Sequence, residues 1–277
     1  MRFAKMNGAG NDFIILNNMD RKIPASRFPE IAQVLCRRRM SVGADGLMVV
    51  EPAEQGGDFR MLFYNADGSA GEMCGNGARC ICRYGCEHGL AGETQAVESP
   101  SGMVRGQRID RRNYRIRLTD PSVTELEKSV EACGRMWPCS YVELGDPGLP
   151  HAVVPYPGLA DRTAEQLREL GCALRWSKAF PKGANVNFYD ITGPDRIRLL
   201  TYERGVEDFT YACGTGTGST VLALTLLGKV SGKDVEVDSA GGTMRVTIER
   251  TGDTAAVWLT GPTNWVCEGE VLDDDLI

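Results

Sequence analysis

The sequence lacks a hydrophobic run long enough to cross a membrane. No stretch approaches the roughly 20 apolar residues that a spanning helix needs. The first residues, Met1 to Met6, lead into glycine and asparagine without the apolar segment of a secretory signal. The net charge of −6 disfavours nucleic acid or an anionic membrane as the main partner. We therefore expect a cytoplasmic protein that binds a small molecule and neither nucleic acid nor a membrane.

Metal-binding patterns are also missing. The chain has only two histidines, and none of its ten cysteines forms a Cys-x-x-Cys pair. This disfavours paired zinc knuckles, and the cysteines between 74 and 86 match no common ferredoxin spacing. We expect no metal. Most cysteines are predicted to be small core residues, because free cysteine is usually buried: Cys36, Cys133, Cys139, Cys172 and Cys267.

The glycine-rich segments lack the features of nucleotide-binding loops. Gly8-Ala9-Gly10 has no third glycine and no strand–turn–helix context, and the segment 214–218 has no P-loop lysine. No lysine stands in a context that indicates a Schiff base. The sequence therefore gives no sign of a nucleotide or of pyridoxal phosphate.

Short strand-like runs dominate the chain. Several alternate polar and apolar residues, as half-buried strands do, and they cover residues 13–16, 47–50, 59–64, 114–118, 151–154, 185–189, 196–200 and 244–248. Helical patterns are fewer and cover residues 28–38, 77–87, 160–170 and 217–227. Because strands and helices do not alternate regularly, the sequence predicts an α+β fold rather than a doubly wound parallel sheet.

Two glycine-rich turns, each followed by an apolar helix, indicate an internal repeat. One begins at Cys74-Gly75-Asn76-Gly77 and the other at Cys213-Gly214-Thr215-Gly216, 139 residues later in a chain of 277. A separation of half the chain length suggests two similar domains. Asp120-Pro121-Ser122 is predicted to be a linker because Pro and Ser break the preceding strand. We predict one domain over residues 1–119, to which 264–277 returns, and a second over 120–263.

A cysteine at the start of a helix is suited to acid/base chemistry. The first N–H groups of the helix have no internal partner, so they bind anions, and the same field favours a thiolate. If Cys74 and Cys213 faced each other, one could remove a Cα proton while the other delivered a proton to the opposite face. Backbone N–H groups would stabilise the charge that develops between these steps. Each turn alone is more typical of a tight turn with a buried thiol, but the recurrence of the turn at half the chain length favours the catalytic interpretation.

Longer motifs resemble those of the diaminopimelate epimerases over essentially the whole chain. They cover residues 6–13, 64–69, 73–79, 148–153, 185–188, 202–205 and 212–216. The resemblance implies two pseudo-symmetric domains, each a mixed β-sheet wrapped around a central helix, with the active site in the cleft between them. It implies interconversion of LL- and meso-diaminopimelate in lysine and cell-wall precursor synthesis, without pyridoxal phosphate, metal or other cofactor. It also implies a homodimer.

Carried over position by position, the resemblance assigns roles to individual residues. Cys74 and Cys213 match the two acid/base cysteines, and His151 and Glu203 match polar residues near the catalytic centre. The remaining matches bind substrate. The backbone donors at the reacting carboxylate are Gly75, Asn76, Gly214 and Thr215, and the groups that hold the far end are Asn11, Asn65, Asn185 and Arg204. Taken alone, the asparagines are also typical of turns, and Arg204 of a surface ion pair with Glu203.

Two positions depart from the family pattern. Leu149 precedes Pro-His where many members have Asn, and Gly46 stands where some have Gln. Because both touch substrate in the family, a racemase of the same fold that acts on another amino acid remains open. A cysteine hydrolase that uses Cys74 with His151, and a non-catalytic amino-acid-binding protein, are further alternatives.

Overall fold

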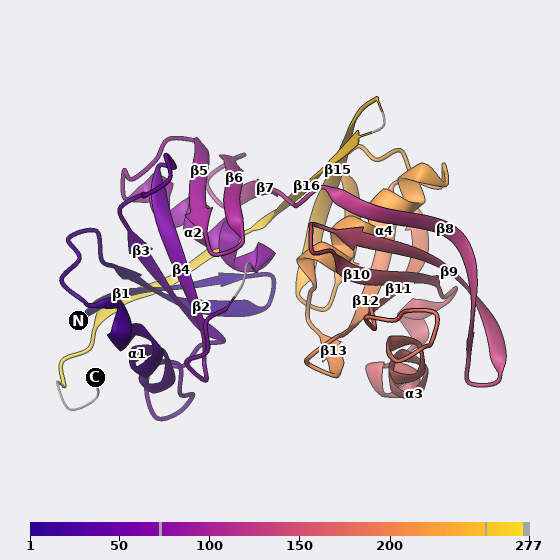
Figure 1. The fold of residues 1–277 in the computed structure, drawn as a ribbon, viewed down its shortest axis with the longest axis horizontal. Helices are drawn as coiled ribbons and strands as arrows, with labels where there is room; N and C mark the ends of the chain where they lie inside the picture. Colours follow the sequence, from indigo (N-terminus) through magenta and orange to yellow (C-terminus); the bar gives the residue numbers. More distant parts are fainter. Residues whose placement is uncertain (72–73, 253, 274–277) are drawn as a thin grey trace. The chain divides into compact units, whose positions relative to one another are not determined.

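A computed structural model describes residues 1–71, 74–252 and 254–273 (Figure 1). The chain divides into two compact units: unit 1 is Met1–Ile116 plus the chain from Gly261 onward, and unit 2 is Arg117–Thr260. The predicted domain boundaries at 119/120 and 263/264 each lie three residues after the observed ones at 116/117 and 260/261. Met73, predicted to belong to a motif, and residues 274–277, predicted to return to the first domain, fall outside the described residues. Within those residues, no helix is long and apolar enough to cross a membrane.

Unit 1 contains a mixed sheet whose strands lie in the order β17-β1-β2-β3-β4-β5-β6-β7. The pairs β2–β3 and β4–β5 are parallel, and the other pairs are antiparallel. The strands are β1 (Arg2–Gly8), β2 (Asn11–Asn17), β3 (Gly46–Glu51), β4 (Phe59–Asn65), β5 (Thr94–Ser99), β6 (Gly102–Arg108), β7 (Asn113–Arg117) and β17 (Asn264–Glu270). A short 3-10 helix, η1 (Ala25–Arg27), and α1 (Phe28–Leu35) join the first parallel pair, and α2 (Gly75–Glu87) joins the second.

Unit 2 repeats this plan in the order β8-β9-β10-β11-β12-β14-β15-β16. Its parallel pairs, β10–β11 and β12–β14, stand at the same places in the order. The strands are β8 (Pro121–Ala132), β9 (Arg135–Leu144), β10 (Leu149–Pro155), β11 (Asn185–Gly193), β12 (Arg196–Glu203), β14 (Val235–Ser239), β15 (Gly242–Thr251) and β16 (Thr254–Pro262), with β13 (Asp208–Thr210) paired to β12. A 3-10 helix, η2 (Leu159–Asp161), and α3 (Ala164–Arg175) join the first parallel pair, and α4 (Gly214–Leu226) the second.

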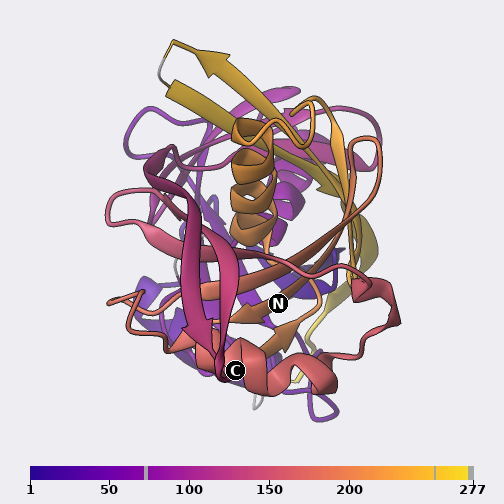
Figure 2. The same ribbon diagram turned by 90° about the vertical axis from the view of Figure 1, so that its right-hand side faces the viewer.

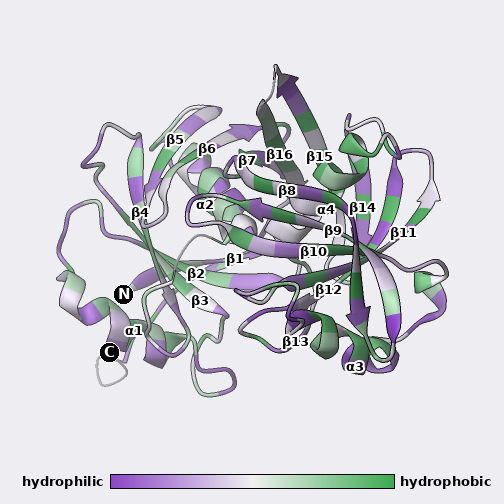
Figure 3. Cartoon of the chain, turned by 45° about the vertical axis from the view of Figure 1, so that its right-hand side comes forward, coloured by the Kyte–Doolittle hydropathy of each residue, from purple (hydrophilic) through white to green (hydrophobic). Residues whose placement is uncertain are grey.

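The two units are therefore pseudo-symmetric, each a mixed sheet around a central helix, as the sequence predicted. Figure 2 shows α4, in orange, standing between strands of unit 2. Along the strands of both units, hydrophobic and hydrophilic residues alternate (Figure 3). This is the pattern of a sheet with one face on a core and the other towards solvent.

Helix α4 is buried on nearly all sides from Gly216 to Leu224, although its first half is polar. The hydroxyl groups of Thr217 and Thr220 donate to the carbonyl oxygens of Cys213 and Gly216, both at 2.8 Å. These bonds satisfy side chains that would otherwise be buried without partners. Threonine is therefore tolerated in the buried first turns of α4, because its hydroxyl group bonds to the backbone of the helix.

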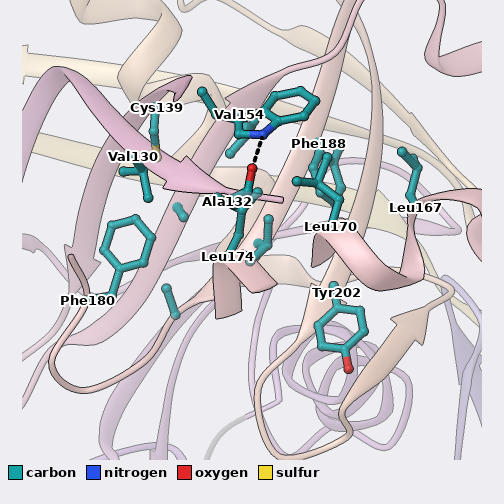
Figure 4. Packing of buried hydrophobic residues seen from close by; sticks show 14 of the residues in the cluster. Val130, Ala132, Cys139, Val154, Leu167, Leu170, Leu174, Phe180, Phe188 and Tyr202 are labelled. Atoms are coloured by element: carbon teal, nitrogen blue, oxygen red, sulfur yellow. Dashed lines mark hydrogen bonds between the residues drawn. The ribbon is translucent and has the colours of Figure 1, made fainter. Parts of the chain in front are cut away.

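The outer helices each cover a hydrophobic core. Helix α1 packs Phe28, Ile31 and Leu35 against β2 and β3 in unit 1. In unit 2, α3 packs Leu167, Leu170 and Leu174 in a cluster where Trp137 Nε1 donates to the carbonyl of Ala132 (Figure 4). Such burial is the main force that holds each unit together.

The structure corrects several local predictions. The helix predicted over residues 160–170 is α3, which begins later because Thr163 caps it, its hydroxyl accepting from the N–H of Gln166 at 3.4 Å. Pro121 and Ser122, predicted as a linker, begin β8, where a first-position proline loses no internal ladder bond.

The prediction that most cysteines are core residues is wrong for three of them. Cys36 and Cys139 are buried, whereas Cys133, Cys172 and Cys267 are exposed. Cys133 lies in the tight turn between β8 and β9 with a φ of 50°. Cys172 and Cys267 lie on a helix and a strand that have one face towards solvent.

Candidate active site

Cys74 is the N-cap of the central helix of unit 1. Its φ and ψ are −105° and 119°, and its carbonyl accepts the N–H of Ala78 at 2.8 Å to close the first turn of α2. The thiol is half-buried. Gly75 and Asn76 follow as the first residues of the helix, so their N–H groups belong to the turn that has no internal acceptors.

Cys213 occupies the equivalent place in unit 2. Its φ and ψ are −112° and 110°, and its carbonyl accepts the N–H of Thr217 at 2.9 Å. The N–H of Gly216 points at its Sγ, 3.4 Å away, and the side chain is 8% exposed. The two predicted cysteines thus have matching backbone geometry at the starts of matching helices.

The starts of both helices are electrostatically prepared for an anion. Neither α2 nor α4 has an acidic residue in its first turn. Acidic side chains commonly neutralise this end of a helix, where the peptide dipoles sum to a partial positive charge. Here that field acts on the thiols and on whatever anion binds, so it favours thiolate over thiol.

A row of hydrogen bonds connects the predicted residues of unit 1. Arg79 Nη2 donates to Asn76 Oδ1 at 2.8 Å, and Asn76 Nδ2 donates to Asn11 Oδ1 at 2.8 Å. Asn11 Nδ2 in turn donates to Asp45 Oδ2 at 3.0 Å. Every amide in the row donates in the same direction, from a cation towards a carboxylate. The row fixes both asparagines beside the start of α2.

Arg79 is a buried cation whose role the sequence did not reveal. Arg79 is 0% exposed, and its partners among the described residues are the carbonyl oxygen of Gly75 and Oδ1 of Asn76, neither of them a carboxylate. Burial lowers the pKa of its guanidinium, while the neighbouring thiols of Cys80 and Cys74 oppose this effect. Because arginine stays protonated in proteins, its charge favours a thiolate at Cys74.

Asn65 ends β4 and takes part in a turn. Its side chain donates to Ser69 Oγ at 2.9 Å, and its carbonyl accepts the N–H of Gly68 at 2.9 Å. This matches the general preference of asparagine for turns. Its amide oxygen keeps capacity for a further donor.

Two predicted residues of unit 2, His151 and Asn185, share one face of the sheet with two residues that were not predicted, Asn187 and Thr201. In the register of β10 with β11, His151 lies opposite Asn185, and in that of β11 with β12, Asn187 lies opposite Thr201. Because strand side chains alternate, Asn185 and Asn187 project from the same face. Gly216 of α4 lies against this face, since a Cβ placed there would come within 2.2 Å of Asn187 Oδ1. A polar surface therefore lies beneath the first turn of α4.

Asn185 ties together the ends of three strands. Its Nδ2 donates to the carbonyl of Pro150 at 3.1 Å, and its Oδ1 accepts the backbone N–H of Arg204 at 2.8 Å. Arg204 Nη1 donates to the carbonyl of Lys182 at 3.1 Å. Among the described residues, no ion pair joins Arg204 to Glu203, whose carboxylate instead accepts the hydroxyl of Thr210, so the surface ion-pair alternative is wrong.

Glu203 and His151 both have a perturbed pKa. Burial raises the pKa of Glu203, against the lowering effect of the Thr210 hydroxyl, which donates to it at 2.9 Å. Burial and the nearby Arg204 charge lower the pKa of His151 to about 3. His151 is therefore neutral at physiological pH. Perturbed groups of this kind are typical of functional sites.

Comparison with known proteins gives the family. A sequence model described as diaminopimelate epimerase matches residues 3–121 and 145–266. The chain is 35% identical to diaminopimelate epimerase from Aquifex aeolicus (strain VF5) over 285 residues, covering 100% of the chain and 99% of that protein. It is 36% identical over 269 residues to diaminopimelate epimerase from Chlorobaculum tepidum, covering 96% and 99%. The chain belongs to the diaminopimelate epimerase family.

Solved structures of low identity share the fold. A phenazine biosynthesis protein of the PhzF family from Bacillus anthracis aligns with a TM-score of 0.74 at 14% identity, covering 99% of each chain. A hydroxyproline epimerase from Agrobacterium vitis aligns with a TM-score of 0.68 at 19% identity, covering 100% of this chain and 94% of the other. The unmatched residues 122–144 of the family comparison correspond to the β8–β9 hairpin.

Against this family background, the structure groups the predicted residues into two sets. Asn11, Asn65, Cys74, Gly75 and Asn76 belong to unit 1. The set in unit 2 is His151, Asn185, Glu203, Arg204, Cys213, Gly214 and Thr215. Sequence analysis missed Arg79, Asn187 and Thr201. The period-2 spacing of Asn185 and Asn187 was the available signal for one of them.

Two further features stand apart from this chemistry. A cavity of about 590 Å³ in unit 1 is lined by residues of β1, β2, the end of α2 and β17, and by no predicted site residue. The chemistry of the helix starts, and not the size of this cavity, therefore indicates the candidate site. Among the described residues, no group of His, Cys, Asp or Glu side chains has the arrangement of a metal site.

Proposed function

We propose that this protein interconverts LL- and meso-diaminopimelate by a two-base mechanism in which Cys74 and Cys213 are the acid and the base. The observation that carries the proposal is the equivalence of these cysteines as N-caps of matching helices in a duplicated fold. Membership of the diaminopimelate epimerase family supports the choice of substrate. In the proposed complex, the two helix starts converge on one carboxylate.

The proposed reaction moves one proton off Cα and another one on. A thiolate takes the Cα proton, and the electron pair of the broken C–H bond moves towards the α-carboxylate. The N–H groups of Gly75, Asn76, Gly214 and Thr215 donate to that carboxylate. The loss of one such donor typically costs about 3 kcal/mol of transition-state stabilisation. The opposite thiol then protonates the other face, which inverts the stereocentre and needs no cofactor in the proposal.

The far end of the substrate is proposed to bind Arg204, Asn185, Asn11 and Asn65. Arg204 offers a two-pronged donor to the distal carboxylate. Each of the three asparagine side chains already holds a structural hydrogen bond and retains capacity for another. The protein is further proposed to act as a homodimer in the cytoplasm, in lysine and cell-wall precursor synthesis.

Solvent exchange tests the proposal. In deuterium oxide, the wild-type protein should convert LL- to meso-diaminopimelate with incorporation of deuterium at Cα. Cys74→Ser and Cys213→Ser should each lose at least about 100-fold in rate, because one proton partner is then missing in each direction. Cys267→Ser, at an exposed position, is the matched control. Full activity in either active-cysteine variant would contradict the two-base mechanism.

A racemase acting on another amino acid is the second candidate, because Leu149 replaces the asparagine common in the family. The same exchange assay on a panel of amino acids separates the two. Deuterium entering another amino acid, but not diaminopimelate, would favour this candidate. A Cys–His hydrolase is disfavoured because His151, with a pKa of about 3, is too weak a base to activate a thiol near neutral pH.

A further inference from the structure

The duplication places a different set of side chains at three equivalent positions. In unit 1, Phe13 lies opposite Gly46 and Met48 lies opposite Phe63. In unit 2, His151 lies opposite Asn185 and Asn187 lies opposite Thr201. The registers therefore equate Phe13, Met48 and Phe63 with His151, Asn187 and Thr201.

An equivalent glycine of the central helix packs on these side chains in each unit. Gly77 and Gly216 each follow the N-cap cysteine by three residues. A Cβ on Gly77 would lie 2.0 Å from Met48 Cε, and a Cβ on Gly216 would lie 2.2 Å from Asn187 Oδ1. Unit 1 shows that apolar side chains can fill this space, so the fold itself does not require a polar group at 187.

The contacts of Asn187 fix the orientation of its amide. The side chain is 0% exposed. Nδ2 lies 3.2 Å from the carbonyl oxygen of Ala152 and 3.3 Å from that of Asn185, while Oδ1 accepts the hydroxyl of Thr201 at 3.0 Å. Because a carbonyl oxygen only accepts hydrogen bonds, the NH₂ group must face Ala152 and Asn185.

This orientation determines the state of the histidine ring. The same Nδ2 lies 3.3 Å from His151 Nδ1. The NH₂ group cannot accept a hydrogen bond, so a hydrogen on Nδ1 would point at the hydrogens of the amide. Nδ1 therefore carries no hydrogen, and Nε2 of the neutral ring carries one. His151 Nε2 is buried and has no hydrogen-bond partner among the described residues. A buried N–H group without a partner is costly and indicates a ligand or a moving group that completes it.

We propose that Asn187 is a positioning residue that holds His151 in the Nε2–H tautomer, so that the ring serves the active site as a fixed hydrogen-bond donor and not as a base. The relevance of that donor rests on the proposed function. The tautomer itself rests only on the contacts of unit 2. The acceptor of the Nε2–H group is a carboxylate or a thiolate, the groups that carry negative charge in the proposed reaction.

Nitrogen NMR tests the tautomer directly, because the chain has only two histidines. Uniformly ¹⁵N-labelled His88→Gln protein leaves His151 as the sole ring to observe. At neutral pH, its long-range ¹H–¹⁵N spectrum should show an unprotonated Nδ1 and a protonated Nε2. A protonated Nδ1 would overturn the proposal.

Two substitutions of Asn187 test its role in the same His88→Gln background. Asn187→Met installs the side chain that unit 1 carries at the equivalent position and removes the donor, so a population of the Nδ1–H tautomer should appear. Asn187→Asp supplies an acceptor, so the Nδ1–H form should dominate. Met48→Leu, at the equivalent position of unit 1, is the matched control and should leave the ring unchanged. An unchanged ring in both Asn187 variants would refute the inference, whatever their activity.

Exchange kinetics then connect the tautomer to catalysis. Asn187→Met should lower kcat for Cα exchange about 10-fold or more, with a smaller change in KM, because the donor is disordered while the substrate-binding side chains remain. If Asn187→Met alters the tautomer but not kcat, the donor role is wrong. If the wild-type protein has the expected tautomer but exchanges no proton of diaminopimelate, the proposed function fails while the positioning of His151 stands.

Discussion

His151 makes the stability of the protein sensitive to acid. Its pKa falls from an ordinary 6.5 to about 3 in the folded chain, so between these values the unfolded chain binds a proton that the folded chain does not. Stability is then lost as pH falls from about 6.5 towards 3. His151→Phe, which copies unit 1, should flatten this part of the pH dependence in urea unfolding, whereas His88→Gln should keep it. The same slope in His151→Phe and wild type would contradict the assignment.

The buried charge of Arg79 should act on Cys74. In a Cys213→Ser background, Arg79→Met should shift the pH at which Cys74 reacts with iodoacetamide upwards, because the thiolate loses a neighbouring cation. Arg79→Lys keeps the charge and should give a smaller shift. Peptide mass spectrometry separates Cys74 from the other thiols. Equal reactivity profiles in the three proteins would show that Arg79 serves packing alone.

At this scale, the sequence predicts residues whose role is local. Cys74 and Cys213 stand in recognisable turns, so their backbone position follows from glycine, the helix start and a few neighbours. Asn187 and Thr201 are different, because their contacts depend on the pairing of separate strands, β10, β11 and β12. Arg79 looks like an ordinary helix residue until the sheet of unit 1 covers it.

Helix α3 offers a test at the scale of an element. Thr163 and Gln166 form a reciprocal capping box at its start, with the N–H of Thr163 donating to Gln166 Oε1 at 3.0 Å. Thr163→Ala should destabilise the protein by about 1 kcal/mol, since one N–H then loses its acceptor. Thr163→Ser keeps the acceptor and is the control. Chemical denaturation with tryptophan fluorescence provides the measurement, and equal midpoints would indicate that the cap contributes nothing.

Helices and strands were predictable where one face of an element is buried. Strands β2, β3, β4, β7, β10, β11, β12 and β15 were predicted from their apolar patterns, as were the four helices. The β8–β9 hairpin was not, because β8 carries many charged residues and a bulge between Glu125 and Lys128 interrupts its alternation. Pairing with β9 holds it in place, and such long-range pairing leaves little trace in a local window of sequence.

At the scale of the whole molecule, the proposed reaction predicts a redox response. If Cys74 and Cys213 confront one stereocentre, an added oxidant such as diamide should join them, with two thiols losing two protons and two electrons to the oxidant. Exchange activity should disappear and return with dithiothreitol, and digestion should yield one peptide pair. Cys74→Ser should form no such pair. Oxidised protein that carries this disulfide and stays fully active would contradict the shared site.

The division into two similar domains was predictable from the spacing of the two cysteine turns, and the sheet around a central helix was predictable from the family resemblance. What that spacing could not reveal is how closely strand order and pairing repeat, since these depend on hydrogen bonds between distant segments. It also could not reveal that the two halves differ at the positions beneath their central helices. Met48 and Asn187 are recognised as equivalent only from the strand pairing in the folded units.

The return of the last strand to unit 1 has a consequence for synthesis on the ribosome. Strand β17 pairs with β1, and the amino group of Met1 donates to the carbonyl of Val271 at 2.8 Å. Strand β1 therefore cannot complete its pairing until β17 has been synthesised. Unit 2 is contiguous and can fold while its neighbour is still unfinished. Because the amino group of Met1 contacts Val271, a circular permutant joined at the termini and opened between β7 and β8 would be translated with both units uninterrupted.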